Sequence, residues 1–317
     1  MKNLRLKREH IHVFAPATVA NVGCGFDVFG FAVHQPGDEL ELRVTAQPGV
    51  RIEKITGTVT GLPLDVERNT AGKGLLSFYR YLKPDFGLSV ILHKNMPVGS
   101  GMGSSAASAV ASVFALNEML AEPFDRKILL RYAIAGEKIT SGESVHLDNI
   151  AACLWGGMIL VQSKDPVNIV ELPVPDDLYC TIIHPQIEIR TRESRQILKK
   201  DIALADAVTQ WGNIAGFVSA LYRKDYSLMS KTMRDVIAEP VRSILIPHFD
   251  QMRILATEAG ALGTGISGSG PSVFALSAGR KTAVATGDAI GRFLAAEDIG
   301  HDIFVSEVNR EGPKVVK

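Results

Sequence analysis

The stretch with the clearest chemical potential is glycine-rich and occupies residues 97–108, PVGSGMGSSAAS. Its glycines let backbone N–H groups approach a ligand closely, and a helix that starts directly afterwards adds unpaired N–H donors and a positive dipole end. This combination favours an anion such as a phosphate. The hydroxyl of Ser104 or Ser105 could cap the helix, and the other could reach a metal or a phosphate oxygen. A tight strand-to-helix connection, with glycines for close packing, is the alternative.

This loop does not match either common phosphate-binding pattern. No lysine follows its last glycine, as GxxxxGK[ST] requires, and Ser104 stands where the dinucleotide fingerprint has its third glycine. A second glycine-rich stretch, GTGISGSGPS at 263–272, does contain GxGxxG. A helical pattern precedes it and a strand follows, which is the reverse of a dinucleotide site. It is therefore interpreted as a second loop that could come close to the first.

The elements that must position these loops follow an irregular order. Apolar runs and alternating patterns predict strands at 11–15, 38–44, 88–93, 156–162, 179–183, 272–276 and 302–306. Helical periodicity predicts helices at 104–120, 126–139, 201–222 and 248–260. The charged, proline-bearing stretch 163–177 is the best candidate for a boundary, which divides the chain into domains 1–165 and 166–317. The order indicates an α+β fold in two parts.

Composition narrows the class of protein. The 317 residues include 34 Lys+Arg and 34 Asp+Glu without a basic stripe, so we expect no nucleic-acid partner. Cys24, Cys153 and Cys180 lack CxxC spacing, which argues against disulfides or zinc and favours a reducing compartment. The N-terminal segment contains His12 and Pro16 and predicts a strand rather than a signal peptide. No run approaches the roughly 20 apolar residues of a membrane span, so we expect a cytoplasmic protein.

Four motifs resemble those of one kinase superfamily. PVGSGMGSSAAS is similar to the phosphate loop of the GHMP small-molecule kinases, and LGTGISGSGPSVFAL resembles their C-terminal glycine motif. APATVANVGCGFDVFGFAV (15–33) and VHLDNIAACLWGG (145–157) resemble motifs of the homoserine kinases within it. The four motifs occur in the expected order and cover the chain nearly end to end.

This resemblance implies a fold and an activity. The fold is the two-domain GHMP kinase fold, with a ribosomal protein S5 domain 2-like N-terminal domain and a ferredoxin-like C-terminal domain. The activity is ATP-dependent phosphorylation of the side-chain hydroxyl of L-homoserine to O-phospho-L-homoserine, a step of threonine biosynthesis. The resemblance also implies a homodimer.

The nucleotide site implied by the resemblance surrounds the first glycine loop. Mg²⁺ prefers a carboxylate and sometimes a hydroxyl, and by similarity Glu137 and Ser105 hold it. Without the resemblance, Glu137 would be interpreted as a solvent-facing carboxylate. Asn69 and Thr70 match a segment that contacts adenine in relatives, although such a pair before glycine is also typical of a turn. The implied ATP-binding residues are Asn69, Pro97, Val98, Gly99, Ser100, Gly101, Met102, Gly103, Ser104, Ser105, Ala106 and Ala107.

The implied amino-acid site offers a partner for each charged group of the substrate. Arg195 and Arg242 match family arginines that bind its carboxylate, a task suited to a planar guanidinium. Arg192 is the alternative to Arg195. Asn21 and Asp27 fit as acceptors for the ammonium, although both residue types often bond their own backbone beside glycine.

The implied hydroxyl end of the site lies in the His-x-Asp-Asn segment. His146 lines the pocket by similarity, although a lone histidine is more often structural. Asn149 lies near the accepting hydroxyl, and Asp148 is the alternative because mevalonate kinase-like members use an aspartate base in this region. We expect positioning instead of a dedicated base, since a loose transition state gains mainly from positioning and charge stabilisation. The implied catalytic residues are Asn149, Ser105 and Glu137.

The sequence departs from the homoserine kinase pattern in three places. Val19 replaces a serine, Cys24 replaces a proline, and an extra residue near Glu143 lengthens the segment between Glu137 and His146. Two other functions stay open. A kinase for another small alcohol, such as mevalonate, would need no ammonium site. A non-catalytic relative that binds a small molecule as a sensor would show an eroded glycine loop or eroded Mg²⁺ ligands.

Overall fold

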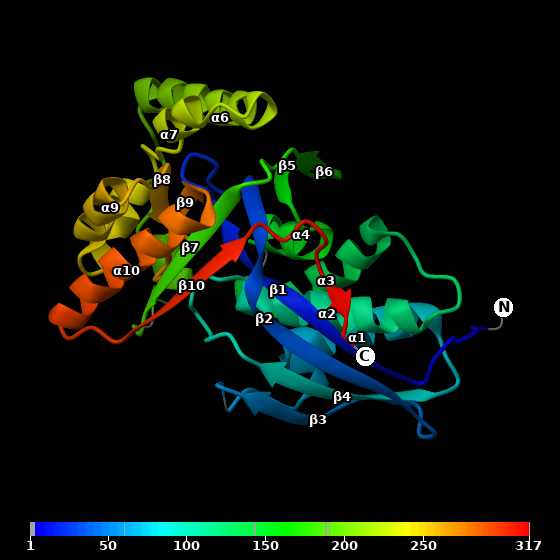
Figure 1. The fold of residues 1–317 in the computed structure, drawn as a ribbon. Coiled ribbons are helices and arrows are strands. Elements are labelled where there is room, and N and C mark those ends of the chain that lie inside the picture. Colours follow the sequence, from blue (N-terminus) through cyan, green and yellow to red (C-terminus); the bar gives the residue numbers. More distant parts are fainter. Residues whose placement is uncertain (1–3, 60, 143, 188, 190, 317) are drawn as a thin grey trace.

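The computed structural model describes residues 4–59, 61–142, 144–187, 189 and 191–316, with the side chains of 191–193 left out (Figure 1). Glu143, beside the extra residue, therefore lies outside the described residues. In the part of the chain that is described, no helix combines the length and apolar character needed to cross a bilayer. Cys24, Cys153 and Cys180 are free and buried.

The first sheet has seven strands and carries the N-terminal half. Its main order is β11-β1-β2-β4-β3, and β5 pairs with both β2 and β6. The strands are β1 (His10–Ala20), β2 (Phe29–Thr45), β3 (Gly49–Gly57), β4 (Gly87–Lys94), β5 (Met158–Lys164), β6 (Val167–Leu172) and β11 (Lys314–Val315). β3 and β4 are parallel, and their connection includes α1 (Thr70–Leu82).

Helices of the first half pack against one another and against β1 and β2 (Figure 1). Besides α1 they are α2 (Ser104–Met119), α3 (Arg126–Ser141) and α4 (Leu147–Trp155). α2 was expected to show one apolar stripe, but 13 of its 16 residues are buried. Its alanines and serines are small enough for neighbouring elements to approach on all sides, so the helix start is held rigidly in the core.

The second sheet is antiparallel, with the order β10-β7-β9-β8. Its strands are β7 (Leu178–Pro185), β8 (Gly263–Ile266), β9 (Val273–Ala278) and β10 (His301–Glu307). The helices α9 (Phe249–Glu258) and α10 (Arg280–Ala296) contact this sheet. Strand, helix, two strands, helix and strand form the ferredoxin-like arrangement. The predicted two-part α+β fold is confirmed.

The connection from β7 to α9 carries four shorter or peripheral helices. They are α5 (Thr191–Gln196), α6 (Leu204–Arg223), α7 (Tyr226–Thr232) and α8 (Glu239–Arg242). Single 3₁₀ turns occur at Val66–Arg68 and Ser243–Leu245. This connection brings Arg195 and Arg242 to the junction of the two halves.

The two sheets divide the chain differently from the expected limits. β5 and β6 form a hairpin across residues 165 and 166, with Ile159 opposite Glu171, so that expected boundary lies inside the first sheet. The change of sheet occurs at 173–177 instead. β11 then returns to the first sheet, with Val13 opposite Val315. The last strand therefore ties the chain end back to the N-terminal half.

Candidate active site

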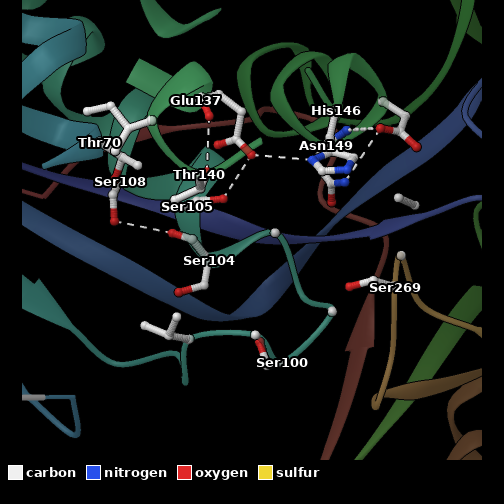
Figure 2. Close-up of a pocket in the computed structure, with 18 of the residues that line it drawn as sticks. Thr70, Ser100, Ser104, Ser105, Ser108, Glu137, Thr140, His146, Asn149 and Ser269 are labelled. Carbon is white, nitrogen blue, oxygen red and sulfur yellow. Dashed lines mark hydrogen bonds and ion pairs between the residues drawn. The ribbon is translucent and has the colours of Figure 1, made fainter. Parts of the chain in front are cut away.

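A cavity of about 360 Å³ lies where the two halves meet. Its lining brings together fifteen of the predicted residues, several of them visible in Figure 2: Asn21, Asp27, Asn69, Val98, Gly99, Ser100, Gly101, Gly103, Ser104, Ser105, Glu137, His146, Asn149, Arg195 and Arg242. The predicted loop residues Pro97, Met102, Ala106 and Ala107 do not line it. Met102, Ala106 and Ala107 are fully buried, so they contribute to the core.

The first glycine loop turns the chain directly into α2. Gly99, Gly101 and Gly103 all have positive φ, and Gly103 is the N-cap of the helix with φ +68°. No side chain caps this helix, so the prediction that Ser104 or Ser105 does so is wrong. A left-handed glycine at the cap places both serines inside the first turn. The N–H groups at the helix start are thus left for an anion.

The two glycine loops are in direct contact, as the sequence suggested. The hydroxyl of Ser267 donates to the carbonyl of Gly101 at 2.7 Å, and the N–H of Ser272 donates to the carbonyl of Ser100 at 3.1 Å. A Cβ at Gly101 would lie 2.4 Å from the carbonyl oxygen of Ser267. A glycine is needed at that point because the second loop covers the first.

A buried ion pair beneath the loop was missed by the sequence analysis. Lys94 is 2% exposed, and its ammonium contacts the carboxylate of the fully buried Asp38. The same ammonium donates to the hydroxyls of Ser104 at 2.6 Å and Ser108 at 3.0 Å. Asp38 in turn accepts from the N–H of Asn95 at 2.9 Å. The pair therefore joins the residue that leads into the loop to the helix that follows it. The only available signal was a lysine at the end of an apolar strand.

Ser105, Glu137 and His146 meet beside the loop (Figure 2). The Ser105 hydroxyl donates to Glu137 Oε1 at 3.0 Å, and His146 Nδ1 lies 3.5 Å from the same oxygen. Glu137 is 2% exposed, so the solvent-facing interpretation is wrong. Among the described residues, nothing donates a hydrogen bond to its buried Oε2. An unpartnered carboxylate oxygen beside a hydroxyl fits Mg²⁺.

Any metal held here would have few protein ligands. The described part of the chain contains no group of three or more His, Cys, Asp or Glu residues that could hold an ion. Mg²⁺ usually keeps several waters and binds through one or two carboxylates together with substrate phosphates. The Ser105–Glu137 pair at the phosphate loop fits that habit better than it fits zinc, which takes a closed set of nitrogen and sulfur ligands.

The start of α4 places Asn149 against the phosphate loop. Asn149 Oδ1 accepts a hydrogen bond from the Thr18 hydroxyl at 2.7 Å. A Cβ at Gly103 would lie 2.0 Å from that hydroxyl oxygen and 2.9 Å from Asn149 Oδ1. Asp148, beside it, is 2% exposed. Burial, reinforced by the negative charge of Asp27, raises the pKa of Asp148 to about 6, although the nearby His146 acts in the opposite direction.

The turn between β1 and β2 holds Asn21 and Asp27, both with positive φ. Asn21 Oδ1 accepts from the N–H of Asp27 at 3.0 Å, and its amide donates to the carbonyl of Gly268 at 2.7 Å. The local backbone role considered for Asn21 is thus real, and it also fixes the turn against the second glycine loop. Asp27 lines the cavity, and its carboxylate also contacts the half-exposed Lys164 at 3.3 Å.

Arg195 pairs with Asp27 in this pocket. One guanidinium nitrogen, Nη2, lies 2.9 Å and 3.1 Å from the two carboxylate oxygens. Burial by itself would raise the pKa of Asp27, but the charges of Arg195 and Lys164 outweigh it and hold that pKa below its usual value. The side chain of the alternative, Arg192, lies outside the described part of the structure. Two residues expected to bind opposite ends of one substrate therefore bind each other.

Arg242 is bonded differently, to backbone carbonyls. It is 5% exposed, and its guanidinium donates to the carbonyls of Ser194 at 3.2 Å and Gly268 at 3.1 Å. The guanidinium also lies 4.9 Å from the ring centre of Phe26. Within the described residues, no carboxylate lies at ion-pair distance. Burial lowers the pKa of Arg242 to about 10, against the pull of Asp27, so the group stays cationic at neutral pH.

Asn69 lines the cavity but also has a structural task. It is the N-cap of α1, and its side chain accepts from the N–H groups of Ala71 and Gly72. Its amide nitrogen donates to the carbonyl of Pro63 at 3.0 Å. The turn interpretation considered for this segment therefore holds, and the adjacent Thr70 begins the helix. Because the side-chain amide of Asn69 is already hydrogen-bonded, a nucleotide base would contact the edge of the cavity beside it.

Comparisons with known proteins show to which family the chain is similar. The family of the GHMP kinases N terminal domain matches residues 69–157, and the GHMP kinases C terminal family matches residues 217–296. Homoserine kinases of Chlorobium phaeobacteroides (strain BS1) and Chloroherpeton thalassium are 42% and 43% identical, and the matches cover 96% of this chain and 98% of each relative.

Solved structures of kinases are also similar to this chain. Homoserine kinase from Cytophaga hutchinsonii is 51% identical, with a TM-score of 0.95 over 98% of this chain and 99% of that one. Mevalonate kinase of L. major, at 17% identity and a TM-score of 0.71, shares the fold. Fold and site thus define a small-molecule kinase that uses ATP. The chain belongs to the homoserine kinase family of the GHMP kinases.

Proposed function

We propose that this kinase transfers the γ-phosphoryl group of ATP to the side-chain hydroxyl of L-homoserine, which yields O-phospho-L-homoserine for threonine biosynthesis. One observation carries the proposal: a single cavity joins a phosphate loop to a site that offers both a buried cation, Arg242, and a carboxylate, Asp27. A substrate with a carboxylate at one end and an ammonium beside it matches both charges. Mevalonate has no ammonium, so it would leave Asp27 without a ligand partner.

At the nucleotide end, the backbone of the glycine loop and the start of α2 are suited to the triphosphate. Ser105 and Glu137 would hold Mg²⁺, which supplies charge neutralisation on the phosphates when bound. The Lys94 ammonium is already paired with Asp38 and hydrogen-bonded to Ser104 and Ser108, so it supports the loop. Asn69, together with Thr70, lies where the loop cavity would receive adenine.

At the hydroxyl end, Asn149 is the residue proposed to position the acceptor. Its Oδ1 is held by Thr18 next to Gly103, which fixes the amide at the phosphate loop. An amide cannot take up a proton at physiological pH, so its contribution would be orientation. Asp148 is mostly ionised at neutral pH if its pKa is about 6, and it remains the alternative as a proton acceptor. His146 would complete this side of the pocket.

At the amino-acid end, Arg242 would bind the carboxylate and Asp27, with Asn21, the ammonium. The Arg195–Asp27 pair gives this end a further property. An incoming ammonium would replace Arg195 at Asp27, and Arg195 would then be free to join Arg242 at the substrate carboxylate. This single exchange at Asp27 would thus provide a partner for both the ammonium and the carboxylate of the substrate. We further propose that the enzyme works in the cytoplasm as a homodimer.

The test is ATP turnover by the purified protein with homoserine, threonine, serine or mevalonate as the acceptor. We expect homoserine to stimulate turnover and to yield a phosphate monoester, identified by ³¹P NMR. Turnover with mevalonate but not homoserine would assign another alcohol kinase. ATP binding without transfer to any acceptor would assign a non-catalytic sensor.

The metal assignment has its own test. Ser105→Ala and Glu137→Gln should each lower kcat and shift the Mg²⁺ concentration needed for half-maximal rate upward. Thr140→Val is the matched control, since Thr140 lines the same cavity but donates to the backbone carbonyl of Glu137 instead of its carboxylate. An unchanged Mg²⁺ response in both variants would refute the assignment.

A further inference from the structure

Gln210 of α6 has a buried side-chain amide that is hydrogen-bonded to two separate stretches of backbone. It is 4% exposed, and its Nε2 donates to the carbonyl of Cys24 at 2.5 Å. Its Oε1 accepts from the N–H of Val236 at 3.0 Å. Gln210 is not among the described residues that line the active-site cavity. The amide therefore joins two backbones from behind the cavity wall.

Each of these two stretches carries one of the charged groups at the amino-acid end of the cavity. Cys24 lies in the turn between β1 and β2, three residues before Asp27, on the side of the molecule that carries α6 and α7 (Figure 1). Val236 lies in the segment that leads into α8, the helix that ends at Arg242. The Asp235 carboxylate joins this segment to α8, because it accepts from three successive N–H groups at 2.7–3.0 Å, the last of them at the first residue of the helix. Gln210 is thus bonded to the supports of both charges.

The turn and the segment before α8 also contact each other directly. A Cβ at Gly23 would lie 2.2 Å from the carbonyl oxygen of Met233, so glycine is needed for the two backbones to approach this closely. The Arg242 guanidinium lies 4.9 Å from the ring centre of Phe26. Along both stretches, the hydrogen bonds of Gln210 fall between these two contacts. They therefore fix the distance between the two backbones at the place where each backbone approaches its charged residue.

The turn depends on such support because its backbone conformation is uncommon. Asn21, Val22 and Asp27 all have positive φ, which is unfavourable for residues other than glycine. Residues in that conformation persist where their surroundings hold them in place. The Asn21 side chain accepts from the N–H of Asp27 and so closes the turn, while Gln210 holds the middle of it at the carbonyl of Cys24. Loss of the Gln210 amide would let the turn relax and would move Asp27.

We propose that Gln210 is a positioning residue that sets the spacing between Asp27 and Arg242, and thereby selects acceptors whose ammonium and carboxylate lie on one carbon. An α-amino acid presents these two charges at a fixed separation, so it gains from both contacts only when the protein groups are held at the matching distance. A ligand with one of the two charges makes one contact and tolerates a change in spacing. This inference rests on the proposed function, because it uses the roles proposed there for Asp27 and Arg242.

The first test is the variant Gln210→Met, which keeps an unbranched side chain of similar length and removes both hydrogen bonds. The carbonyl of Cys24 and the N–H of Val236 then lose their buried partner, and the turn and the segment shift relative to each other. The KM for homoserine should rise about tenfold, while the KM for ATP should change less than about twofold, in initial-rate kinetics with each substrate varied in turn. An unchanged KM for homoserine would overturn the proposal.

Asn117→Leu is the matched control for the loss of a buried amide. Asn117 is 3% exposed and lies near the end of α2, far along the helix from the phosphate loop. Its side chain also bonds two backbone groups, the N–H and the carbonyl of Phe124. This variant should lower the Tm, as Gln210→Met does, but leave both KM values unchanged. An equal rise in the KM for homoserine in both variants would show that Gln210 contributes general stability alone. If Gln210→Met does not fold, Gln210→Glu takes its place, because it keeps an acceptor for Val236 and removes the donor to Cys24.

The second test uses two analogues that each lack one charge of homoserine. 4-Hydroxybutyrate lacks the ammonium, and 3-aminopropan-1-ol lacks the carboxylate. In Gln210→Met, their inhibition constants against homoserine should change less than about twofold, although the KM for homoserine rises about tenfold. Equal weakening of homoserine and both analogues would mean that the whole pocket is disturbed, which contradicts a role in spacing. A wild-type protein that does not phosphorylate homoserine would refute the proposed function itself, whereas homoserine turnover with an unchanged KM in Gln210→Met would refute only the positioning role.

Discussion

Individual buried charges determine what this cavity can hold. Arg242 is the clearest case, because its guanidinium has lost most of its water and is satisfied by backbone carbonyls. A buried cation of this kind gains most from an incoming anion. Arg195, by contrast, already has a carboxylate at 2.9 Å. The two arginines therefore have different surroundings in the structure, although they share a role in the proposed complex.

Replacing Arg242 should affect one substrate only. Arg242→Ala removes charge-assisted hydrogen bonds worth about 1.5–3 kcal/mol each, so the KM for homoserine should rise roughly 10- to 150-fold. The KM for ATP should change less than about threefold, and initial-rate kinetics with each substrate varied in turn measure both. Arg68→Ala is the control, because Arg68 lines the same cavity in the part proposed to receive the nucleotide. A rise confined to the KM for ATP would remove Arg242 from the amino-acid site.

Asp148 should make stability depend on pH. Its folded pKa of about 6 exceeds the usual 3.8, so the folded state holds its proton more tightly than the unfolded state does. The contribution to stability is complete below about pH 4 and is lost as the pH rises to 6, a loss on the order of 3 kcal/mol. Asp148→Asn should remove it, so urea unfolding from pH 4 to 8 should show a smaller fall in the unfolding free energy. The exposed Asp288→Asn should keep the wild-type profile, and an identical profile for both variants would contradict this account.

At the scale of elements, local sequence patterns predicted most strands and several helices, but they did not predict which distant segments contact one another. The predicted segments at 104–120 and 126–139 are α2 and α3, and all seven predicted strand segments lie on observed strands. α1, α4 and α10 were not predicted, nor were the short helices α5, α7 and α8. α4 is buried on every residue, so it has no polar face to give a helical period. Contacts between distant segments left no local signal, as with Lys94 and Asp38, which are 56 residues apart.

The Lys94–Asp38 pair should position the phosphate loop. Lys94→Met leaves a buried carboxylate without its cation, which typically costs about 3–5 kcal/mol of unfolding free energy. The double variant Lys94→Met/Asp38→Asn should recover most of that loss, because the amide oxygen can still accept from the N–H of Asn95. Its KM for ATP should nevertheless stay raised, by about tenfold, since Ser104 and Ser108 lose their common donor. Recovery of both stability and ATP affinity would show a purely structural pair.

At the scale of the whole molecule, the cavity lies between the two halves of the chain, and both halves line it. Asn21 and Gly101 of the first half bond to Gly268 and Ser267 of the second, and Phe31 meets Phe274 with ring centres 6.3 Å apart. The C-terminal strand then pairs with β1. The family motifs predicted many of the residues that line this cavity because the motifs coincide with the loops that form it. The motifs could not predict the ion pair between Arg195 and Asp27, since it depends on how the two halves pack against each other.

Nucleotide binding should therefore stabilise both halves together. A non-hydrolysable ATP analogue at 100 times its Kd adds about 2.7 kcal/mol to the unfolding free energy, or roughly 4 °C in Tm for a chain of this length. The two tryptophans report on different parts of the chain, Trp155 at the end of α4 and Trp211 on α6, in the connection between β7 and α9. Trp211→Phe and Trp155→Phe each leave one reporter for thermal unfolding followed by fluorescence. Both variants should show the same transition and the same shift, because the loops that line the cavity are bonded to each other. A shift seen by Trp155 alone would mean that the nucleotide stabilises the surroundings of α4 without the connection that carries α6.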